Sequence, residues 1–233
     1  MKFRSHIFRS ELAAAAYTLV TNQEIWLDHA KRMLEEVDEI PAPTRVLDVG
    51  CGPGTSTRAL SRALNSEDRI CGVDLSWAMI GRAARYERES GQGEAIPYLV
   101  ADACHLPFSE GSFGVVTGHS FLYLVPDRLA VLHEIVRVLQ PGGSLIFLEP
   151  NRNASVAKSA FAGARRWRVV KNQPASAALF AASMVGWRVA SRVAGRLSVD
   201  KVTELFIQAG LGEIKVLERL GGLGLLCVGR KPG

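Results

Sequence analysis

The chain has 233 residues, of which 48% are hydrophobic, so it can bury the core of one α/β domain. Its formal net charge of +5 is mild, and charge alone does not indicate a nucleic-acid partner. The four cysteines are scattered, with no Cys-x-x-Cys pair and no paired histidine cluster. This pattern argues against a metal site and favours a reducing cytoplasm. We therefore expect one cytoplasmic domain over residues 1–233 that holds no metal ion.

Residues 1–40 are expected to form an N-terminal helical cap in two pieces, divided near Thr21 and Asn22. The apolar run Leu12–Val20 follows basic residues, as in a signal peptide. However, Glu11 interrupts the approach and no small-residue cleavage site follows, so an amphipathic helix fits better. No apolar run reaches the ~18 residues that a membrane span needs. A soluble protein is expected.

From residue 44 onward, strand and helix patterns alternate along the chain. The expected elements are strands at 44–49, 69–73, 96–101, 113–117 and 144–148, with helices at 55–64, 77–89 and 127–139. Such alternation is typical of a doubly wound, mainly parallel sheet, with ligands beyond the carboxyl ends of its strands.

The end of the chain is expected to close this sheet. Pro141-Gly142-Gly143 predicts a sharp turn before the fifth strand. After a helix at 198–209, the strands Glu213–Arg219 and Leu223–Gly229 form an antiparallel hairpin around Leu220-Gly221-Gly222.

The most informative segment is Val46–Gly54, which reads Val-Leu-Asp-Val-Gly-Cys-Gly-Pro-Gly. Its apolar start predicts a central strand that is buried on both faces. Its glycines allow a sharp turn and a close approach to a ligand, where a Cβ atom would collide. Thr55-Ser56-Thr57 are expected to cap the following helix, whose N–H groups point back at the turn. The spacing departs from the Gly-x-Gly-x-x-Gly fingerprint of dinucleotide enzymes.

Three aspartates, Asp48, Asp74 and Asp102, lie at the ends of successive predicted strands. These strand ends meet at one edge of a parallel sheet, so the three carboxylates are expected in one crevice. Each aspartate alone has another reading, as a helix cap or a residue of a solvated loop. Their common register with the glycine turn favours a binding site instead.

An ordered set of segments resembles the class I S-adenosylmethionine-dependent methyltransferases, in their small-molecule branch. The set is Val46–Gly54, Asp74 with Leu75, Ala101–Phe108 and His133–Gly143, and it covers about residues 44–150. The resemblance implies S-adenosyl-L-methionine as cofactor. It also implies an α/β fold, a doubly wound Rossmann-like seven-stranded sheet of order 3-2-1-4-5-7-6. The last strand would be antiparallel, and a helical insert would follow strand 5.

Within that resemblance, Asp74 is expected to accept hydrogen bonds from the ribose hydroxyls and Asp102 from the adenine amine. Asp48 is expected to face the positive amino and sulfonium end of the cofactor. The full set of expected cofactor contacts is Asp48, Gly50, Cys51, Gly52, Gly54, Asp74, Leu75, Asp102, Ala103 and His119.

Methyl transfer requires above all that the nucleophile is positioned and water excluded. His119, after the fourth strand, is the candidate catalytic base for a hydroxyl acceptor, since an imidazole titrates near pH ~6.5. The alternative is a histidine that packs or bonds beside the cofactor. Tyr17 and Tyr123 are candidate substrate contacts, although Tyr17 has the alternative of a packed aromatic. Family members that methylate nucleobases carry a run that resembles Asn-Pro-Pro-Tyr or Asp-Pro-Pro-Tyr after this strand. Neither run is present here, which counts against a nucleobase substrate.

Residues 151–197 break the alternation and are expected to form helices, and the resemblance implies that this helical insert is the substrate lid. Nine Lys or Arg residues lie between Asn151 and Asp200, and Asp200 is the only acid there. An apolar face with a basic rim suits an apolar substrate that carries a carboxylate, a phosphate or a carrier-bound thioester. A solvated basic face and transient docking on an anionic membrane are the alternatives. The expected substrate contacts here are Phe180, Met184, Trp187 and Arg188.

The sequence thus predicts a cytoplasmic biosynthetic methyltransferase that acts on an apolar small molecule, such as a natural product, a quinone or a lipid-like compound. Oxygen is favoured as the acceptor atom over carbon and nitrogen. An RNA methyltransferase that uses the basic insert and a non-catalytic cofactor-binding module remain alternatives. Nucleic acid is disfavoured as a partner, and no feature indicates the oligomeric state.

Overall fold

The computed structural model describes residues 11, 14–15, 17–18, 33–36, 43–64, 69–90, 96–154, 185–189, 191–192 and 195–233. The strands are β1 (Arg45–Val49), β2 (Arg69–Asp74), β3 (Tyr98–Val100), β4 (Phe113–His119), β5 (Leu139–Pro150), β6 (Gly212–Arg219) and β7 (Gly224–Arg230). The α-helices are α3 (Thr55–Ser61), α4 (Trp77–Ser90), α5 (Arg128–Val138) and α9 (Val199–Gln208). Short 3-10 turns are η2 (Leu34–Glu36), η3 (Leu122–Leu124) and η4 (Leu220–Gly222).

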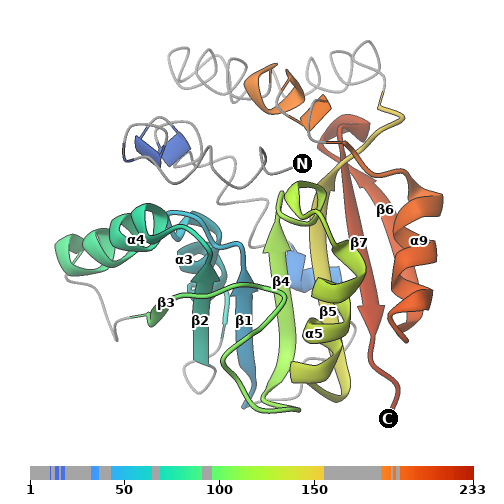
Figure 1. Ribbon diagram of the computed structural model, residues 1–233, viewed down its shortest axis with the longest axis horizontal. Coiled ribbons are helices and arrows are strands. Elements are labelled where there is room, and N and C mark those ends of the chain that lie inside the picture. The colour runs from blue at the N-terminus through green and yellow to red at the C-terminus, as the bar shows by residue number, and fades with distance from the viewer. Residues whose placement is uncertain are drawn as a thin grey trace.

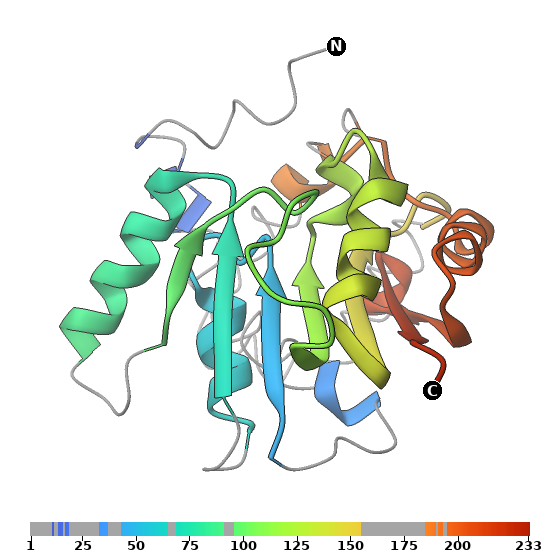
Figure 2. The same cartoon turned by 60° about the horizontal axis from the view of Figure 1, so that its bottom comes forward.

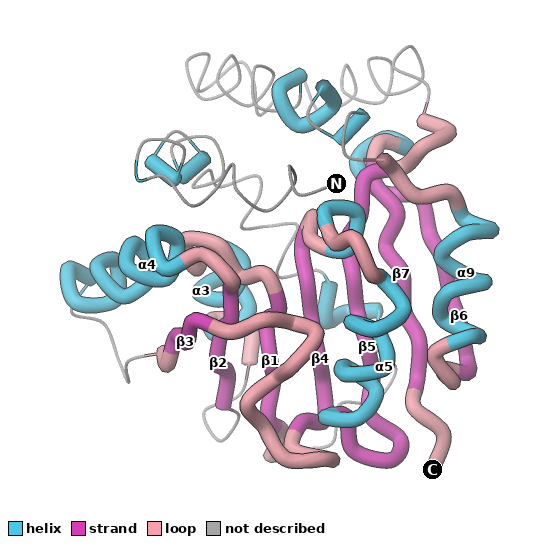
Figure 3. The backbone as a smooth tube through the Cα atoms, viewed as in Figure 1, coloured by secondary structure: helices cyan, strands magenta, loops and turns pink. Residues whose placement is uncertain are grey.

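The strands form one seven-stranded sheet of order β3-β2-β1-β4-β5-β7-β6 (Figures 1 and 3). β1 to β5 pair in parallel, whereas β7 runs antiparallel to both β5 and β6. The predicted strand order and the antiparallel last strand are therefore confirmed.

Apolar side chains of each central strand alternate between two core layers. Leu47 faces the layer that α5 and α9 cover, and these helices lie on the same side of the sheet (Figures 1 and 2). Val46, next to Leu47 in β1, packs on the opposite face with Leu60 of α3 and with Leu34 of η2. Burial on both faces explains why the central strands are continuous apolar runs rather than alternating patterns.

The start of α3 differs from the prediction. Gly54 is its N-cap, in the left-handed region with φ 77°, and no side chain caps it. The hydroxyls of Ser56 and Thr57 donate instead to the buried carboxylate of Asp48. The predicted cap by Thr55-Ser56-Thr57 is therefore wrong, because a buried anion recruits two of its hydroxyls.

The segment Pro141-Gly142-Gly143 also differs from the prediction, because it lies inside β5 rather than before it. Phe113 of β4 pairs with Leu139, but Val115 pairs with Ser144, so the extra residues of β5 are absorbed by a register shift. The segment predicted as a turn is therefore a bulge within a longer strand.

The insert after β5 is described only in part. Residues 185–189, 191 and 192 are helical, in line with the predicted helical insert, and a parallel bridge joins Asn151 to Leu197. Phe180 and Met184, two of the expected substrate contacts, lie outside the described residues. Over the parts of the chain that are described, no helix is long and apolar enough to cross a membrane.

Candidate active site

The residues expected at the site gather at one edge of the sheet. Gly50 follows β1, Asp74 ends β2, Asp102 follows β3 and His119 ends β4. Because these four strands are parallel, their carboxyl ends share this edge, at the top of Figure 1. The helical part of the insert, drawn in orange, lies above the same edge (Figure 1).

The glycine turn is covered by aromatic side chains. Gly50 and Gly54 have φ of 67° and 77°, a region that L-residues rarely adopt. A Cβ atom on Gly50 would overlap the ring of Phe121, and one on Gly54 would lie 2.6 Å from the Tyr98 hydroxyl. The absence of side chains in the turn therefore lets aromatic rings, or a flat ligand of similar size, contact its backbone.

Asp74 is bonded to the glycine turn itself. Its Oδ2 accepts a hydrogen bond from the Gly52 amide at 3.0 Å, and its Oδ1 accepts from the Ser76 amide at 2.8 Å. The Cys51 amide donates to the Val73 carbonyl at 3.0 Å, which ties the buried Cys51 to β2. Burial raises the pKa of Asp74, and the two amide donors oppose that rise. The carboxylate is thus held at the edge of the turn where a ribose is expected.

Tyr17 lies next to this carboxylate. The ring is 3.7 Å from where a Cβ atom of Gly52 would stand, and it packs with Ala78 and Met79 at the start of α4. Burial raises the Tyr17 pKa to about 12, and the negative charges of Asp74 and Glu149 add to that rise. Tyr17 therefore stands over the turn, and a contact with cofactor or substrate stays a prediction.

Asp48 has partners that the sequence did not indicate. Only 1% of the residue is exposed, and its carboxylate accepts hydrogen bonds from Ser56 at 2.8 Å, Thr57 at 2.7 Å and Thr117 at 3.1 Å. Burial raises its pKa to about 6 although the three hydroxyls oppose that rise. Asp48 thus links β1, α3 and β4 below the turn. Its contact with the positive end of the cofactor stays a prediction.

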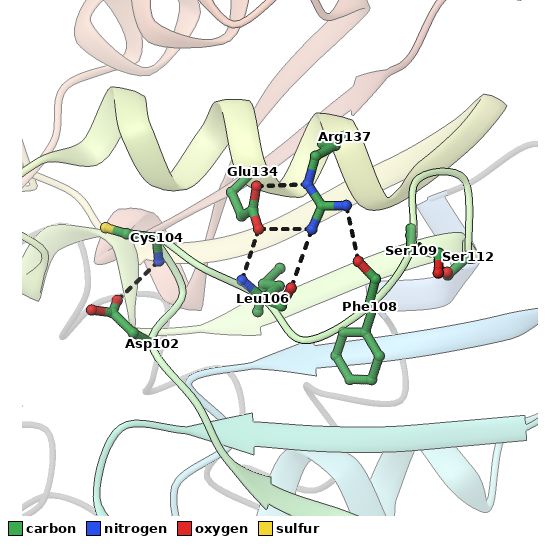
Figure 4. Close-up of polar contacts among 8 residues, drawn as sticks. All are labelled: Asp102, Cys104, Leu106, Phe108, Ser109, Ser112, Glu134 and Arg137. Atoms are coloured by element: carbon green, nitrogen blue, oxygen red, sulfur yellow. Dashed lines mark hydrogen bonds and ion pairs between the residues drawn. The ribbon is translucent and has the colours of Figure 1, made fainter.

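The loop after β3 is clamped onto α5 by an ion pair (Figure 4). Arg137 and Glu134 form two charge-assisted hydrogen bonds of 2.7 and 2.8 Å. Arg137 also donates to the carbonyls of Leu106 and Phe108, while Glu134 accepts from the Leu106 amide. The hydrogen bonds from Arg137 hold the pKa of Glu134 below its usual value. This clamp fixes the loop that carries Asp102.

Within that loop, Asp102 is exposed and its Oδ1 accepts from the Cys104 amide at 2.9 Å. Ala103 is buried, at 8% exposure, whereas 43% of Leu75 after β2 is exposed. An exposed leucine beside Asp74 offers an apolar surface at this edge of the sheet. The adenine contacts expected from these residues stay predictions.

The end of β4 has an unusual backbone. Ser120 has φ 55°, a left-handed conformation that is uncommon for a residue other than glycine, and its amide donates to the Leu148 carbonyl at 2.7 Å. The half-buried His119 precedes it, opposite Leu148 in the register with β5. This places His119 at the carboxyl edge, where the sequence predicted it, and its role as a base stays a prediction.

The insert reaches the same place. The indole Nε1 of Trp187 donates to the Ser120 hydroxyl at 3.0 Å, which brings the described part of the insert to the end of β4. Arg188 donates instead to the carbonyls of Asn151 and Ala154, at 3.1 and 3.0 Å. The structure therefore shows Trp187 bonded to the end of β4, and it shows Arg188 bonded to the backbone at the start of the insert.

Tyr123 and Glu149 differ from what the sequence indicated for the side of the site where the methyl acceptor is expected. Tyr123 is only 4% exposed, and burial raises its pKa. Little of its surface is therefore accessible for the expected contact with the substrate. Glu149, to which sequence reasoning gave no role, is fully buried and accepts a hydrogen bond from the Tyr123 amide. An acidic residue at the end of a predicted strand was the signal that could have pointed to it.

These residues suit S-adenosylmethionine. A flat group can approach the backbone of the glycine turn. Aromatic rings now take the space that Cβ atoms would fill if these residues were not glycines. Asp74 offers carboxylate oxygens at the end of β2, where ribose hydroxyls bind in doubly wound folds.

Comparisons with known proteins agree with this reading. A family model described as a methyltransferase domain matches residues 47–147. A demethylmenaquinone methyltransferase of Shouchella clausii is 30% identical over 207 residues, which cover 87% of this chain and 84% of that protein. One from Staphylococcus saprophyticus is 30% identical over 202 residues, covering 86% and 84%.

Solved structures show the same fold. Phosphoethanolamine N-methyltransferase 2 of Haemonchus contortus, solved with S-adenosyl-L-methionine, superposes with a TM-score of 0.70 at 17% identity. That match covers 100% of this chain but only 60% of the other. A methyltransferase of Thermotoga maritima gives a TM-score of 0.65 at 18% identity, over 98% and 99% of the two chains. The chain therefore belongs to the class I S-adenosylmethionine-dependent methyltransferases, in their small-molecule branch.

Proposed function

We propose that this methyltransferase transfers the methyl group of S-adenosylmethionine to an apolar, quinone-type aromatic small molecule. The observation that carries the proposal is the hydrogen bond from Trp187 to Ser120, because it brings an aromatic side chain of the insert to the methyl-transfer edge. The partly exposed Phe121 lies at the same end of the sheet, and its ring makes an edge contact with the fully buried Phe147, with centroids 6.0 Å apart. Partly exposed aromatic side chains at this edge suit an aromatic ring better than a nucleic-acid backbone.

The similarity to quinone enzymes also extends beyond the cofactor domain. The 207-residue match covers 87% of this chain, so the part left out is shorter than residues 151–197. At least part of the insert is therefore aligned with proteins named for a quinone substrate. The family domain alone, at residues 47–147, would not support a substrate class.

When bound, S-adenosylmethionine supplies an electrophilic methyl group. The residues of this chain bind and orient the reactants around it. The glycine turn and Asp74 would hold the cofactor, while Trp187 and the insert would exclude water from the acceptor. A ring nitrogen of His119 would accept the proton that an acceptor hydroxyl loses. This role for His119 is the reason why we propose oxygen as the acceptor atom.

The test is an acceptor panel with the purified full chain and S-adenosylmethionine. It contains a reduced short-chain naphthoquinone, a simple phenol, phosphoethanolamine and transfer RNA, and products are identified by mass spectrometry and NMR. We expect the naphthoquinol to be methylated fastest, with the new methyl group on oxygen. A methyl group on ring carbon would overturn the choice of atom and leave the substrate class standing. Methylation of phosphoethanolamine or RNA, with none of the quinol, would overturn the substrate class.

We also propose transient contact of the insert with an anionic membrane, where apolar quinones reside. Val185 and Val189 are 64% and 61% exposed, one helical turn apart, and Arg192 is exposed near them. Residues 151–199 carry nine basic residues and no acid. Sedimentation with anionic and with neutral vesicles tests this contact, and equal binding to both would contradict it.

All four cysteines are free thiols, which supports the cytoplasm as the compartment of the protein.

A further inference from the structure

We infer that Glu149 is a positioning residue for the methyl transfer: its carboxylate holds the segment Ser120–Tyr123, and with it the Phe121 ring, against the glycine turn. This inference rests on the proposed function, since it concerns the same site. Glu149 is the last residue but one of β5, and the segment it holds follows β4, so the contact bridges two adjacent strand ends.

The hydrogen bonds define the contact. Oε1 of Glu149 accepts from the amides of Phe121 at 3.0 Å and Leu122 at 2.8 Å, and Oε2 accepts from the Tyr123 amide at 3.0 Å. These amides lie at the start of η3, where a helical turn leaves its N–H groups without backbone acceptors. One buried carboxylate therefore caps three consecutive amides with charge-assisted bonds.

The segment needs such a restraint because its backbone is strained. Ser120 is held at φ 55°, and a conformation of this kind persists only where the surroundings fix it. Phe121 is the next residue, and its ring occupies the position that a Cβ atom of Gly50 would take. A shift of the segment would therefore move the aromatic ring that rests on the cofactor-binding turn.

The charges around Glu149 make this restraint dependent on pH. Arg128 of α5 faces the carboxylate, and it also donates to the carbonyls of Leu122 and Tyr123. Among the described residues, the carboxylate also interacts electrostatically with the hydroxyls of Tyr17 and Tyr123 and with the thiol of Cys227 of β7. Burial raises the pKa of Glu149 to about 7, against the opposing effect of the three amides and Arg128. A proton on either oxygen removes an acceptor, so the segment is held most firmly above that pH.

Glu149→Gln tests the inference with a change of one atom. The amide oxygen can still accept from Phe121 and Leu122, but the NH₂ group would face the Tyr123 amide. We expect hydrogen exchange at Tyr123 to accelerate, with less effect at Phe121 and Leu122. In the wild type, corrected for intrinsic exchange, protection of the three amides should increase between about pH 6 and pH 8. The variant should lack this increase.

Kinetics give the second measurement. In Glu149→Gln, kcat should fall by about 10-fold to 100-fold, the range for a small misplacement near the chemistry. Glu149→Asp keeps the charge and should restore part of kcat and of the pH dependence. Glu204→Gln, on the exposed face of α9, is the matched control and should change neither quantity.

Unchanged protection and unchanged kcat in Glu149→Gln would overturn the inference. If that variant does not fold, hydrogen exchange and kcat of Glu149→Asp decide: protection of the three amides must still increase with pH, and a flat pH profile would overturn the inference. Hydrogen exchange needs no substrate, so it separates this inference from the proposed function. A wild type that shows the protection pattern but methylates no quinol would overturn only the proposed function.

Discussion

Asp74 and Gly52 are 22 residues apart in the sequence, yet the Gly52 amide donates a hydrogen bond of 3.0 Å to the Asp74 carboxylate. The residue expected to bind the ribose therefore also fixes the middle glycine of the turn. Its other oxygen accepts from the Ser76 amide, at the entry to α4. The expected cofactor contact and the shape of the turn thus depend on the same side chain.

From this link we predict that Asp74→Ala weakens S-adenosylmethionine binding by roughly 1–3 kcal/mol, the range for the loss of a charged acceptor. Asp74→Asn should fall between the wild type and Asp74→Ala, since an amide oxygen still accepts one hydrogen bond. Isothermal titration calorimetry measures the three affinities. Asp200→Ala, in the first turn of α9, serves as the control. Equal affinities for wild type and Asp74→Ala would contradict the assignment.

The order of the elements could be predicted from the sequence because the central strands are buried on both faces. Such strands leave short apolar runs that glycine and helical patterns separate. The predicted start of the fifth strand was wrong, because a register shift places Pro141–Gly143 inside β5. No side-chain pattern reports a register shift.

The sequence predicted where the site lies in the fold, but it did not predict which residues contact one another there. Local spacing located the glycine turn and Asp74 beside it. The partner of Asp48 in β4 is Thr117, 69 residues later, and Glu149 accepts from Leu122, 27 residues earlier. Contacts at such separations leave no periodic signal in the sequence. The predicted helix cap was wrong for a different reason, because the carboxylate of Asp48, eight and nine residues earlier, accepts hydrogen bonds from the Ser56 and Thr57 hydroxyls.

Asp48 makes stability depend on pH. Its pKa is raised from 3.8 to about 6, so the folded protein binds a proton more tightly than the unfolded chain. The free energy of unfolding of the wild type, relative to Asp48→Asn, should therefore fall as the pH rises from about 4 to about 6. The expected fall is at most about 3 kcal/mol. Urea denaturation across this range measures it, and parallel pH profiles for the two proteins would contradict the prediction.

Arg137 holds the loop that carries Asp102 (Figure 4). Arg137→Ala removes the bonds to the Leu106 and Phe108 carbonyls and leaves Glu134 without its cation. We expect the protein to lose about 1–3 kcal/mol of stability and the KM for S-adenosylmethionine to rise. Arg137→Lys should not restore either value, because a lysine lacks the planar fork of donors. Denaturant unfolding and initial rates at varied cofactor check both effects, and full recovery by lysine would argue against the clamp.

His119 and His133 form a matched pair for the test of the catalytic base. His119 ends β4 at the carboxyl edge, whereas His133 is exposed on α5 and contacts the Gln208 carbonyl. If oxygen is the acceptor, His119→Ala should lower kcat by ~10²–10⁴, a much larger effect than its effect on cofactor affinity. His133→Ala should leave both unchanged. Near wild-type turnover in His119→Ala would leave that residue only a role in packing or positioning.

The basic insert offers two arginines with different surroundings. Arg188 donates to the carbonyls of Asn151 and Ala154, while Arg192 is exposed. Arg188→Glu should therefore lower the melting temperature, because two backbone acceptors lose their donor. Arg192→Glu should leave the melting temperature and cofactor affinity unchanged.

For an acceptor with a carboxylate or phosphate, Arg192→Glu should raise KM by about 5-fold, the effect of roughly 1 kcal/mol at an exposed charge. An uncharged acceptor of the same ring structure should show no change, and Arg192→Gln should fall between. Added salt should reduce the difference between the two acceptors, since exposed charges are screened. If both acceptors respond equally to Arg192→Glu, the arginine acts on the insert as a whole and not on the charge of the substrate. Steady-state kinetics at two ionic strengths separate these outcomes.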